Sequence, residues 1–480
     1  MREPARARRL GVVLSLFAFV SAAYFVPGAS WSPVSRFCLT RALVERRSLE
    51  ITPFVASTGD RAEVDGRFYT DKGPVPSFAA APVYAVFYTV ARARHHVPAF
   101  RAEGTAREPA RRVLPSPAFR TGLYLCSLTT SAIALAALAW ALLDVLSRRV
   151  SLEAAALATL TTVLGTPLFP YATSFFDHTV AAALLFGAFA LLDPTRPRTD
   201  RTTAAAGALL ALSVGTEYVT ALPAVIVASV TLLRPRASFR SLLAGAAVPL
   251  VLLGAYHFAC FGSPFRTGYS FITNPGFAAG QSTGLFGITW PKPAALFGIL
   301  FGSSRGLFYV SPVAFMGVFA AARALRRPAD AALVVGALAL GALALVNASY
   351  YLWDGGRAFG PRHLVPALGF VGVGVGYAFE RYRTFTAVLA GLSVVVVMLG
   401  TVVGLEVPSH LDVIFDYIVP AIREGSIARA PGSANLGLLV GLGARGSLLP
   451  IGAVAVAAFV TATRLAASAD AGHVEPPGST

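Results

Sequence analysis

The chain has 480 residues, of which 55% are hydrophobic and only 13% carry charge. An average soluble protein carries charge on about 25% of its residues, so this chain has too little polar surface to cover a water-soluble globule of its size. Its mean hydropathy is +0.64, which predicts an integral membrane protein. The same composition excludes a disordered chain, and three cysteines are too few for a disulfide framework.

The net charge is +16, and arginine supplies nearly all of it, with Lys72 and Lys292 as the only lysines. The arginines lie between apolar runs and not in one patch. Such placement is typical of the positive-inside rule, so the charge indicates membrane topology and not a nucleic-acid partner.

Apolar runs follow one another along the chain, and a membrane pass needs about 20 such residues. In chain order the runs are 10–26, 119–143, 152–169, 176–192, 203–216, 218–233, 242–261, 307–322, 331–347, 364–379, 385–405 and 448–465. They predict an all-α polytopic membrane protein with about twelve transmembrane helices, in a range of 11 to 13.

The continuous apolar stretch 203–233 is too long for one pass, since roughly 31 residues at about 1.5 Å each exceed a hydrocarbon core of about 30 Å. Arginines flank it at 196–201 and 234–240, which places both ends in the cytoplasm. The stretch is therefore predicted to be a hairpin that turns near Glu217. The same reasoning makes 152–192 a hairpin as well, whose turn carries Asp177 and His178. In chain order, 152–192 is the first hairpin and 203–233 is the second. Short passes leave a depression on the outer face.

Placing the arginine clusters on one side predicts cytoplasmic termini and a single transmembrane domain over 1–465. The long first extracytoplasmic loop is then 27–117, and a disordered cytoplasmic tail follows at 466–480. Further outer loops are expected over 262–306, 348–363 and 406–447.

The short apolar segment 77–90 has two readings. As a juxtamembrane helix on the outer surface it breaks the charge rule in one loop. As a span it would reverse the topology and place five downstream arginine clusters outside, so the surface position is preferred.

Most other ionisable residues fall on the outer face in this topology. Charges at membrane depth are costly unless they are paired, although each residue alone also fits a helix end in water. Glu217 lies between two long apolar runs and is expected to need a partner such as an outer-face arginine. The outer loops also place aromatic residues beside arginines, which suits either an interfacial belt or an anionic headgroup.

Other motifs are weaker. His95 and His96 have no further ligands at metal-binding spacing. Asp412 and Asp416 lie four residues apart in an amphipathic stretch, which favours a solvated helix face over a cation site. Asn347 begins an N-x-S glycosylation sequon at the end of a predicted span, and such matches are common by chance.

The stretch 58–86, TGDRAEVDGRFYTDKGPVPSFAAAPVYAV, resembles the first extracytoplasmic loop of the GT-C superfamily glycosyltransferases. That group contains protein O-mannosyltransferases and lipid A aminoarabinose transferases. In those enzymes an acidic residue after the first helix precedes a proline-containing turn and a juxtamembrane helix, and here TDKGP stands in the place of the turn. The later stretches FFDHTVAAALLFGAFALL, GTEYVTALPA, SSRGLFYVSP and YYLWDGGRAFGPRHLVPAL look like a bacterial branch of the superfamily. The chain departs from O-mannosyltransferases in that Arg61 follows Asp60, where those enzymes have a tandem Asp-Glu pair, and the paired prolines of the turn are reduced to Gly73–Pro74.

The resemblance implies a multi-pass enzyme of the inner membrane with its active site on the extracytoplasmic face. It would move a sugar, with inversion, from a polyprenyl-phosphate-linked donor to a lipid, glycan or protein acceptor. By position the general base is Asp60, with Asp65 and Asp71 as further claimants. The candidates for binding the donor phosphate are Lys72, Arg305, Arg357 and Arg362. The candidates for lining the substrate cavity are Asp177, His178, Glu217, Tyr269, Trp353 and His363.

No cofactor is firmly predicted, and the ligand spacing gives no support for a divalent cation. Two alternatives remain open. A secondary transporter also has twelve spans with polar residues on broken helices. A ligase-type or non-catalytic protein that handles lipid-linked saccharides would need the outer cavity but not Asp60.

Overall fold

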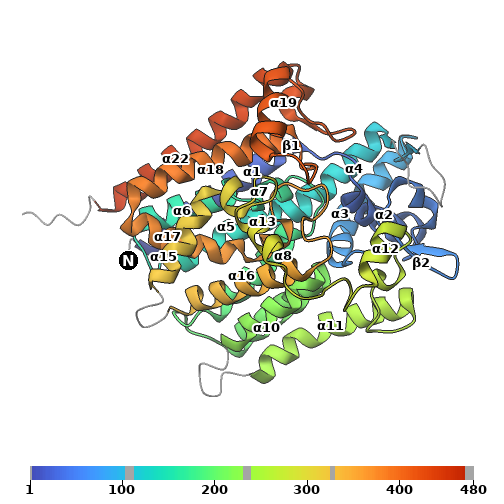
Figure 1. Cartoon of the computed structure of the whole chain (residues 1–480), viewed down its shortest axis with the longest axis horizontal. Helices are drawn as coiled ribbons and strands as arrows, with labels where there is room; N and C mark the ends of the chain where they lie inside the picture. The colour runs from blue at the N-terminus through green and yellow to red at the C-terminus, as the bar shows by residue number, and fades with distance from the viewer. Residues whose placement is uncertain (1–2, 103–112, 231–238, 325–329, 471–480) are drawn as a thin grey trace, which may run out of the picture.

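The computed structural model describes residues 3–102, 113–230, 239–324 and 330–470, and most of this part of the chain is helical (Figure 1). The helices before the second hairpin are α1 (Glu3–Ala23), α2 (Trp31–Arg41), α3 (Val75–Ala93), α4 (Pro117–Ser127), α5 (Ile133–Leu146), α6 (Leu152–Leu164), α7 (Leu168–Ala172) and α8 (His178–Leu192). Those that follow are α9 (Asp200–Thr216), α10 (Ala221–Ser229), α11 (Phe239–Phe261), α12 (Pro275–Gln281), α13 (Pro293–Leu300), α14 (Leu307–Val310), α15 (Pro312–Ala324) and α16 (Ala331–Ser349). The last are α17 (Leu368–Arg381), α18 (Arg383–Val403), α19 (Val419–Glu424), α20 (Leu436–Leu439), α21 (Gly443–Gly446) and α22 (Leu448–Asp470).

The strands form two-stranded antiparallel ribbons. β1 (Phe25–Val26) pairs with β6 (Ala434–Asn435), β2 (Ala62–Val64) with β3 (Arg67–Tyr69), and β4 (Phe100–Ala102) with β5 (Val113–Pro115). The structure is therefore that of an all-helical polytopic membrane protein, as predicted.

A helix overlaps each of the twelve apolar runs, but the helices differ in length. Within the described residues, six helical stretches are long and apolar enough to cross a membrane. These are Pro117–Leu146, Phe239–Phe261, Ala331–Ser349, Arg362–Arg381, Arg383–Val403 and Gly443–Ala466. The count of twelve spans remains a prediction.

Both predicted hairpins consist of short helices that break where the sequence carries polar residues. α6 and α7 lead to α8, and Asp177 is the N-cap of α8. α9 ends at Glu217, its C-cap, and a 3-10 turn at Tyr218–Thr220 leads into α10. A buried carboxylate therefore lies at each turn, where two helices stop short.

One end of the bundle holds a network of ion pairs between helix termini. Arg149 donates to Asp193 at 2.7 Å and to Asp330, the N-cap of α16, at 2.6 Å. Arg148 and Arg196 both contact Asp144, at 2.7 and 3.2 Å. Arginines that the charge rule assigned to one side of the membrane thus meet at one end of the molecule.

The elements of the first loop gather at the opposite end, with α12 beside them, while the N-terminus lies at the end with the ion pairs (Figure 1). α3 covers the segment 77–90 and packs against α2 and α4; it is not among the six stretches above. A small aromatic core stabilises this loop, with the Phe37 ring 5.2 Å from Tyr84 and 5.0 Å from Phe119. The predicted tail begins within α22, which continues to Asp470, and residues 471–480 lie outside the described part.

Candidate functional site

A cavity of about 340 Å³ lies where the two hairpin turns meet the first loop and the later outer loops. Four regions of the sequence contribute its walls. They supply Ser32, Arg36 and Lys72 from the first loop; Asp177, His178, Glu217 and Tyr218 from the hairpin turns; Thr267, Tyr269, Gln281, Phe286 and Ile288 from the outer loops; and Val346, Asn347, Tyr350, Arg362 and His363 from α16 and the segment after it.

Two glycines allow the TDKGP turn to reach this cavity. A Cβ at Gly73 would lie 2.3 Å from the carbonyl oxygen of Thr216, and a Cβ at Gly268 would lie 2.5 Å from the Cα of Asp71. Backbone therefore packs directly on backbone at both positions, which only glycine permits. This close approach places Lys72 in the same cavity as Glu217.

Lys72 joins two carboxylates of the first loop. Its Nζ lies 3.0 Å from Asp60 Oδ2 and 2.9 Å from Asp71 Oδ2. Burial raises the pKa of Asp71; Lys72 opposes this shift and Asp60 adds to it. Burial lowers the pKa of Lys72, but Asp60 and Asp71 outweigh burial, so the pKa is raised and the ammonium stays charged. Two of the three predicted base candidates thus contact one lysine of the cavity wall, although neither is itself a lining residue.

A buried ion pair joins the first loop to the first hairpin. The guanidinium of Arg36, on α2, binds the Asp177 carboxylate, and both side chains are less than 10% exposed. Arg36 also donates to the backbone and side-chain oxygens of Ser32, at 3.0 and 2.6 Å. Asp177 and Arg36 face the cavity as a neutralised pair.

The second hairpin turn carries Glu217, whose partners are histidines and not the arginine expected from the sequence. Its Oε2 lies 3.0 Å from His178 Nδ1, and its Oε1 lies 3.8 Å from His363 Nδ1. The His178 ring packs edge-on against Tyr171 at 4.9 Å. The second hairpin turn is therefore linked by its carboxylate to α8 and to the segment before α17.

The ligand atoms of Asp177, His178 and Glu217 lie within 4.8 Å of one another, so these residues could hold a metal ion. Arg36 binds the Asp177 carboxylate, and His178 Nδ1 lies within hydrogen-bond distance of Glu217. Asp177 Oδ1 and Glu217 Oε1 have no hydrogen-bond partner among the described residues, so the cluster retains free acceptor oxygens.

The aromatic part of the cavity lies against Lys72. The Lys72 Nζ is 6.0 Å from the centre of the Tyr269 ring, which packs edge-on against Tyr218 at 5.9 Å. Burial raises the pKa of Tyr269 to about 12, so its hydroxyl remains a hydrogen-bond donor.

The remaining predicted residues lie elsewhere. Asp65 is exposed at the tip of the β2–β3 ribbon, and Arg357 is exposed in the loop before α17. Arg305 is buried and donates to the carbonyl oxygens of Ser304, Asp354, Gly356 and Val407. Trp353 packs on Gly298. The structure therefore does not bring these four side chains to the cavity wall.

The cavity also contains residues that the sequence did not single out as functional: Arg36, Tyr218, Gln281, Asn347 and Tyr350. No local signal set Arg36 apart, since Arg41, Arg46 and Arg47 follow it closely in the sequence.

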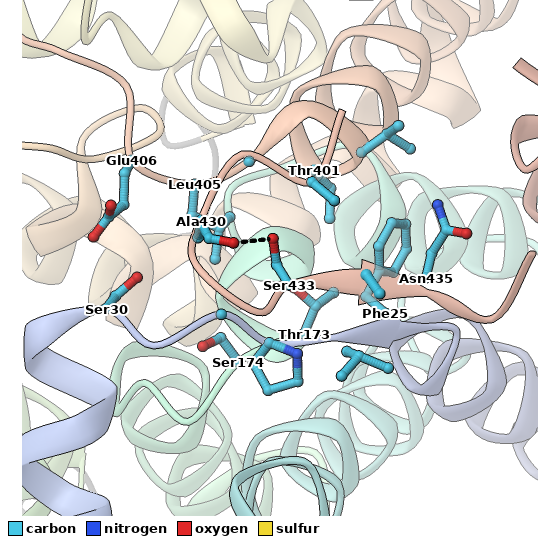
Figure 2. A pocket seen from close by; sticks show the side chains of 17 residues that line it. Phe25, Ser30, Thr173, Ser174, Thr401, Leu405, Glu406, Ala430, Ser433 and Asn435 are labelled. Atoms are coloured by element: carbon cyan, nitrogen blue, oxygen red, sulfur yellow. Dashed lines mark hydrogen bonds between the residues drawn. The ribbon is translucent and has the colours of Figure 1, made fainter. Parts of the chain in front are cut away.

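A second hollow of about 40 Å³ lies beside the β1–β6 ribbon (Figure 2). Phe25, Thr401 and Ser433 are among its lining residues, and the Ser433 hydroxyl donates to the Ala430 carbonyl oxygen at 2.6 Å. That volume holds about one or two water molecules. It is too small for a sugar, so the larger cavity is the candidate functional site.

Comparison with known proteins finds no matching family model and no matching curated protein. Two solved structures of ArnT from Cupriavidus metallidurans are similar in fold. The apo structure is 17% identical and covers 94% of this chain and 74% of the other, with a TM-score of 0.49. The structure bound to undecaprenyl phosphate is 16% identical and covers 95% of this chain and 76% of the other, with a TM-score of 0.48.

Proposed function

We propose that this chain is a membrane glycosyltransferase of the GT-C type. It would transfer a sugar from a polyprenyl-phosphate donor to an acceptor on the extracytoplasmic face. The observation that carries the proposal is the composition of the cavity, in which Arg36, Lys72 and Arg362 share the wall with Asp177 and Glu217. A leaving phosphate needs cations near the developing charge, and an attacking hydroxyl needs a carboxylate to take its proton.

Lys72 and Arg362 are the proposed ligands of the donor phosphate. Both line the cavity, and guanidinium binds phosphate through two parallel hydrogen bonds. Arg305 is less suited to this role because carbonyl oxygens already accept from its guanidinium.

Asp60 is the proposed general base. It follows the first helix, and its carboxylate contacts Lys72 of the cavity wall, so it is positioned to accept the proton of an attacking hydroxyl group. Asp71 contacts the same lysine and is the second candidate.

A secondary transporter is the alternative class, and one observation favours it. Short helices break at buried Asp177 and Glu217 on the cavity wall, and transporters bind their substrates at such breaks. A transporter would move its substrate without releasing polyprenyl phosphate.

The test is donor turnover by the purified full-length protein in detergent. A panel of polyprenyl-phosphate sugars is supplied with a membrane extract as the source of acceptor, and release of polyprenyl phosphate is followed. The expected result is release by the wild type and a fall of about 10²- to 10⁴-fold in Asp60→Asn. Glu63→Gln, an exposed change on the same loop, is the matched control. Absence of release from every donor would contradict the proposal and favour the transporter.

A further inference from the structure

Asn347 is a buried amide at the cavity wall that has no hydrogen-bond partner. It lies near the C-terminal end of α16 and is 3% exposed. Neither its Nδ2 nor its Oδ1 has a partner among the described residues. Buried polar groups in native proteins are nearly always hydrogen-bonded, and an exception calls for an explanation. An amide that offers both a donor and an acceptor at a cavity wall is suited to a ligand that supplies both.

Two other readings of Asn347 do not fit. A structural amide would bind to the protein around it, as Asn435 does when its Nδ2 donates to Ser447 at 3.1 Å and its Oδ1 caps α20. A glycosylated asparagine would lie on an accessible loop, whereas this one is buried within a helix.

A second amide lies in the same wall. Gln281, the last residue of α12, donates from Nε2 to the Tyr350 hydroxyl at 2.6 Å, which fixes the direction of its side chain. Its Oε1 has no partner among the described residues. The cavity therefore contains a further acceptor that is held in position.

The loop that carries these groups is fixed to the end of α16. Thr289 N–H donates to the Ser349 carbonyl oxygen at 2.9 Å, and Tyr351 N–H donates to the Gly287 carbonyl oxygen at 2.8 Å. These backbone hydrogen bonds join the segment after Gln281 to the end of α16, which carries Asn347 and leads to Tyr350. A preorganised polar group in an otherwise apolar wall, here Phe286, Ile288 and Val346, is typical of a site that orients a small ligand.

The cavity therefore has two chemically different sets of groups. One set is ionisable and contains Arg36, Lys72 and Arg362 together with Asp177 and Glu217, with Arg36 and Lys72 paired to carboxylates. The other set, Gln281, Asn347 and Tyr350, is neutral. The hydroxyl groups of a sugar ring are both donors and acceptors, so adjacent hydroxyls match the free amide of Asn347 and the free oxygen of Gln281.

We infer that Asn347 and Gln281 form the subsite that recognises the sugar of the donor through its hydroxyl groups, with Asn347 as a specificity-determining residue. The inference rests on the proposed function, since the sugar is taken to arrive on a polyprenyl phosphate whose charge the basic residues bind.

The test separates sugar binding from phosphate binding. Affinities of the full-length protein in detergent are measured for undecaprenyl phosphate and for its glucosyl, mannosyl, galactosyl and arabinosyl derivatives. For wild type, at least one derivative is expected to bind about 10-fold or more tightly than undecaprenyl phosphate, since a site built for a hydroxyl discriminates strongly. In Asn347→Leu that gain is expected to disappear, while the affinity for undecaprenyl phosphate changes less than about twofold.

Thermal unfolding distinguishes this role from a structural one. Leucine has a similar volume and removes an unpartnered buried amide, so Asn347→Leu is expected to unfold at the wild-type temperature or above it. Asn435→Leu is the control, whose partnered amide is lost and whose unfolding temperature is expected to fall.

The inference is overturned if Asn347→Leu still binds the sugar derivative more tightly than undecaprenyl phosphate. It is also overturned if Asn347→Leu lowers the affinities for undecaprenyl phosphate and for the derivatives equally. It is also overturned if wild type binds undecaprenyl phosphate but no derivative more tightly; that result leaves the lipid-phosphate part of the proposed function standing. Failure of wild type to bind any of the five lipids overturns the proposed function itself.

Discussion

The ion pair between Arg36 and Asp177 is expected to be the most sensitive single contact between the first loop and the bundle. Arg36→Met removes the charge and retains most of the side-chain volume. Asp177 then stays as a buried carboxylate without its cation, because both side chains are less than 10% exposed. Breaking a buried pair by removing one partner costs about 3–5 kcal/mol. The same cost is expected for Asp177→Leu, which leaves the Arg36 guanidinium buried without a counter-charge.

Replacing both residues gives a different result. The double variant Arg36→Met/Asp177→Leu contains no buried charge at this position, and apolar replacement of a whole buried pair is often neutral. We expect the double variant to lose less than about 2 kcal/mol, compared with about 6–10 kcal/mol if the two single effects added.

The assay is a double-mutant cycle on the free energy of unfolding, measured in mixed micelles by denaturant titration. The control cycle uses Arg383 and Glu153, an ion pair in which the arginine side chain is 61% exposed. Exposed pairs contribute up to about 1 kcal/mol, so this cycle should show little coupling. Additive losses at Arg36 and Asp177, or single losses as small as those of the control pair, would refute the reasoning from burial.

Three further predictions concern the site and the topology. Gly73→Ala places a Cβ 2.3 Å from a backbone oxygen and should cost about 1–3 kcal/mol and weaken undecaprenyl phosphate binding; Gly341→Ala, in open space, should cost nothing. Because burial raises the pKa of Asp71 from its ordinary 3.8, the folded state keeps a proton that the unfolded state releases. Wild-type unfolding temperature should therefore fall as pH rises from about 4 through that raised pKa, and Asp71→Asn should flatten this dependence; an unchanged slope would contradict the assignment. A membrane-impermeant maleimide should label Asp65→Cys in intact cells but Arg201→Cys only after permeabilisation, against no background from the three buried native cysteines; the reverse pattern would invert the topology.

The helices could be predicted from the sequence because a chain in lipid must satisfy its backbone hydrogen bonds within each segment. Apolar runs therefore mark helices, and arginines at their ends mark the hairpins. The helical breaks beside Asp177 and Glu217 followed from the same two signals. What hydropathy does not supply is the exact length and tilt of each helix: α6 ends at Leu164, inside the run 152–169, whereas α9 begins at Asp200, before the run 203–216.

The candidate site was predictable where a charge interrupts an apolar run. Seven of its lining residues were predicted on that basis or by resemblance: Lys72, Asp177, His178, Glu217, Tyr269, Arg362 and His363. The pairing within the site was not predictable. Arg36 and Asp177 are 141 residues apart in the chain, and nothing local to either names the other. The prediction of an arginine partner for Glu217 was wrong for the same reason. His178 and His363 come close to Glu217 only because α8 and the segment before α17 pack beside it.

The buried position of Arg36 ties the first loop to the rest of the molecule. The first loop is not a detachable module, because α2 contributes a cation whose counter-charge belongs to the first hairpin and Lys72 extends into a wall made by the second. A chimera that receives this loop without Asp177 would inherit an unneutralised guanidinium, and the loop expressed alone would expose the aromatic surface around Phe37 and Tyr84. Transfer of this cavity to another protein would therefore require the loop and both hairpin turns to be transplanted together.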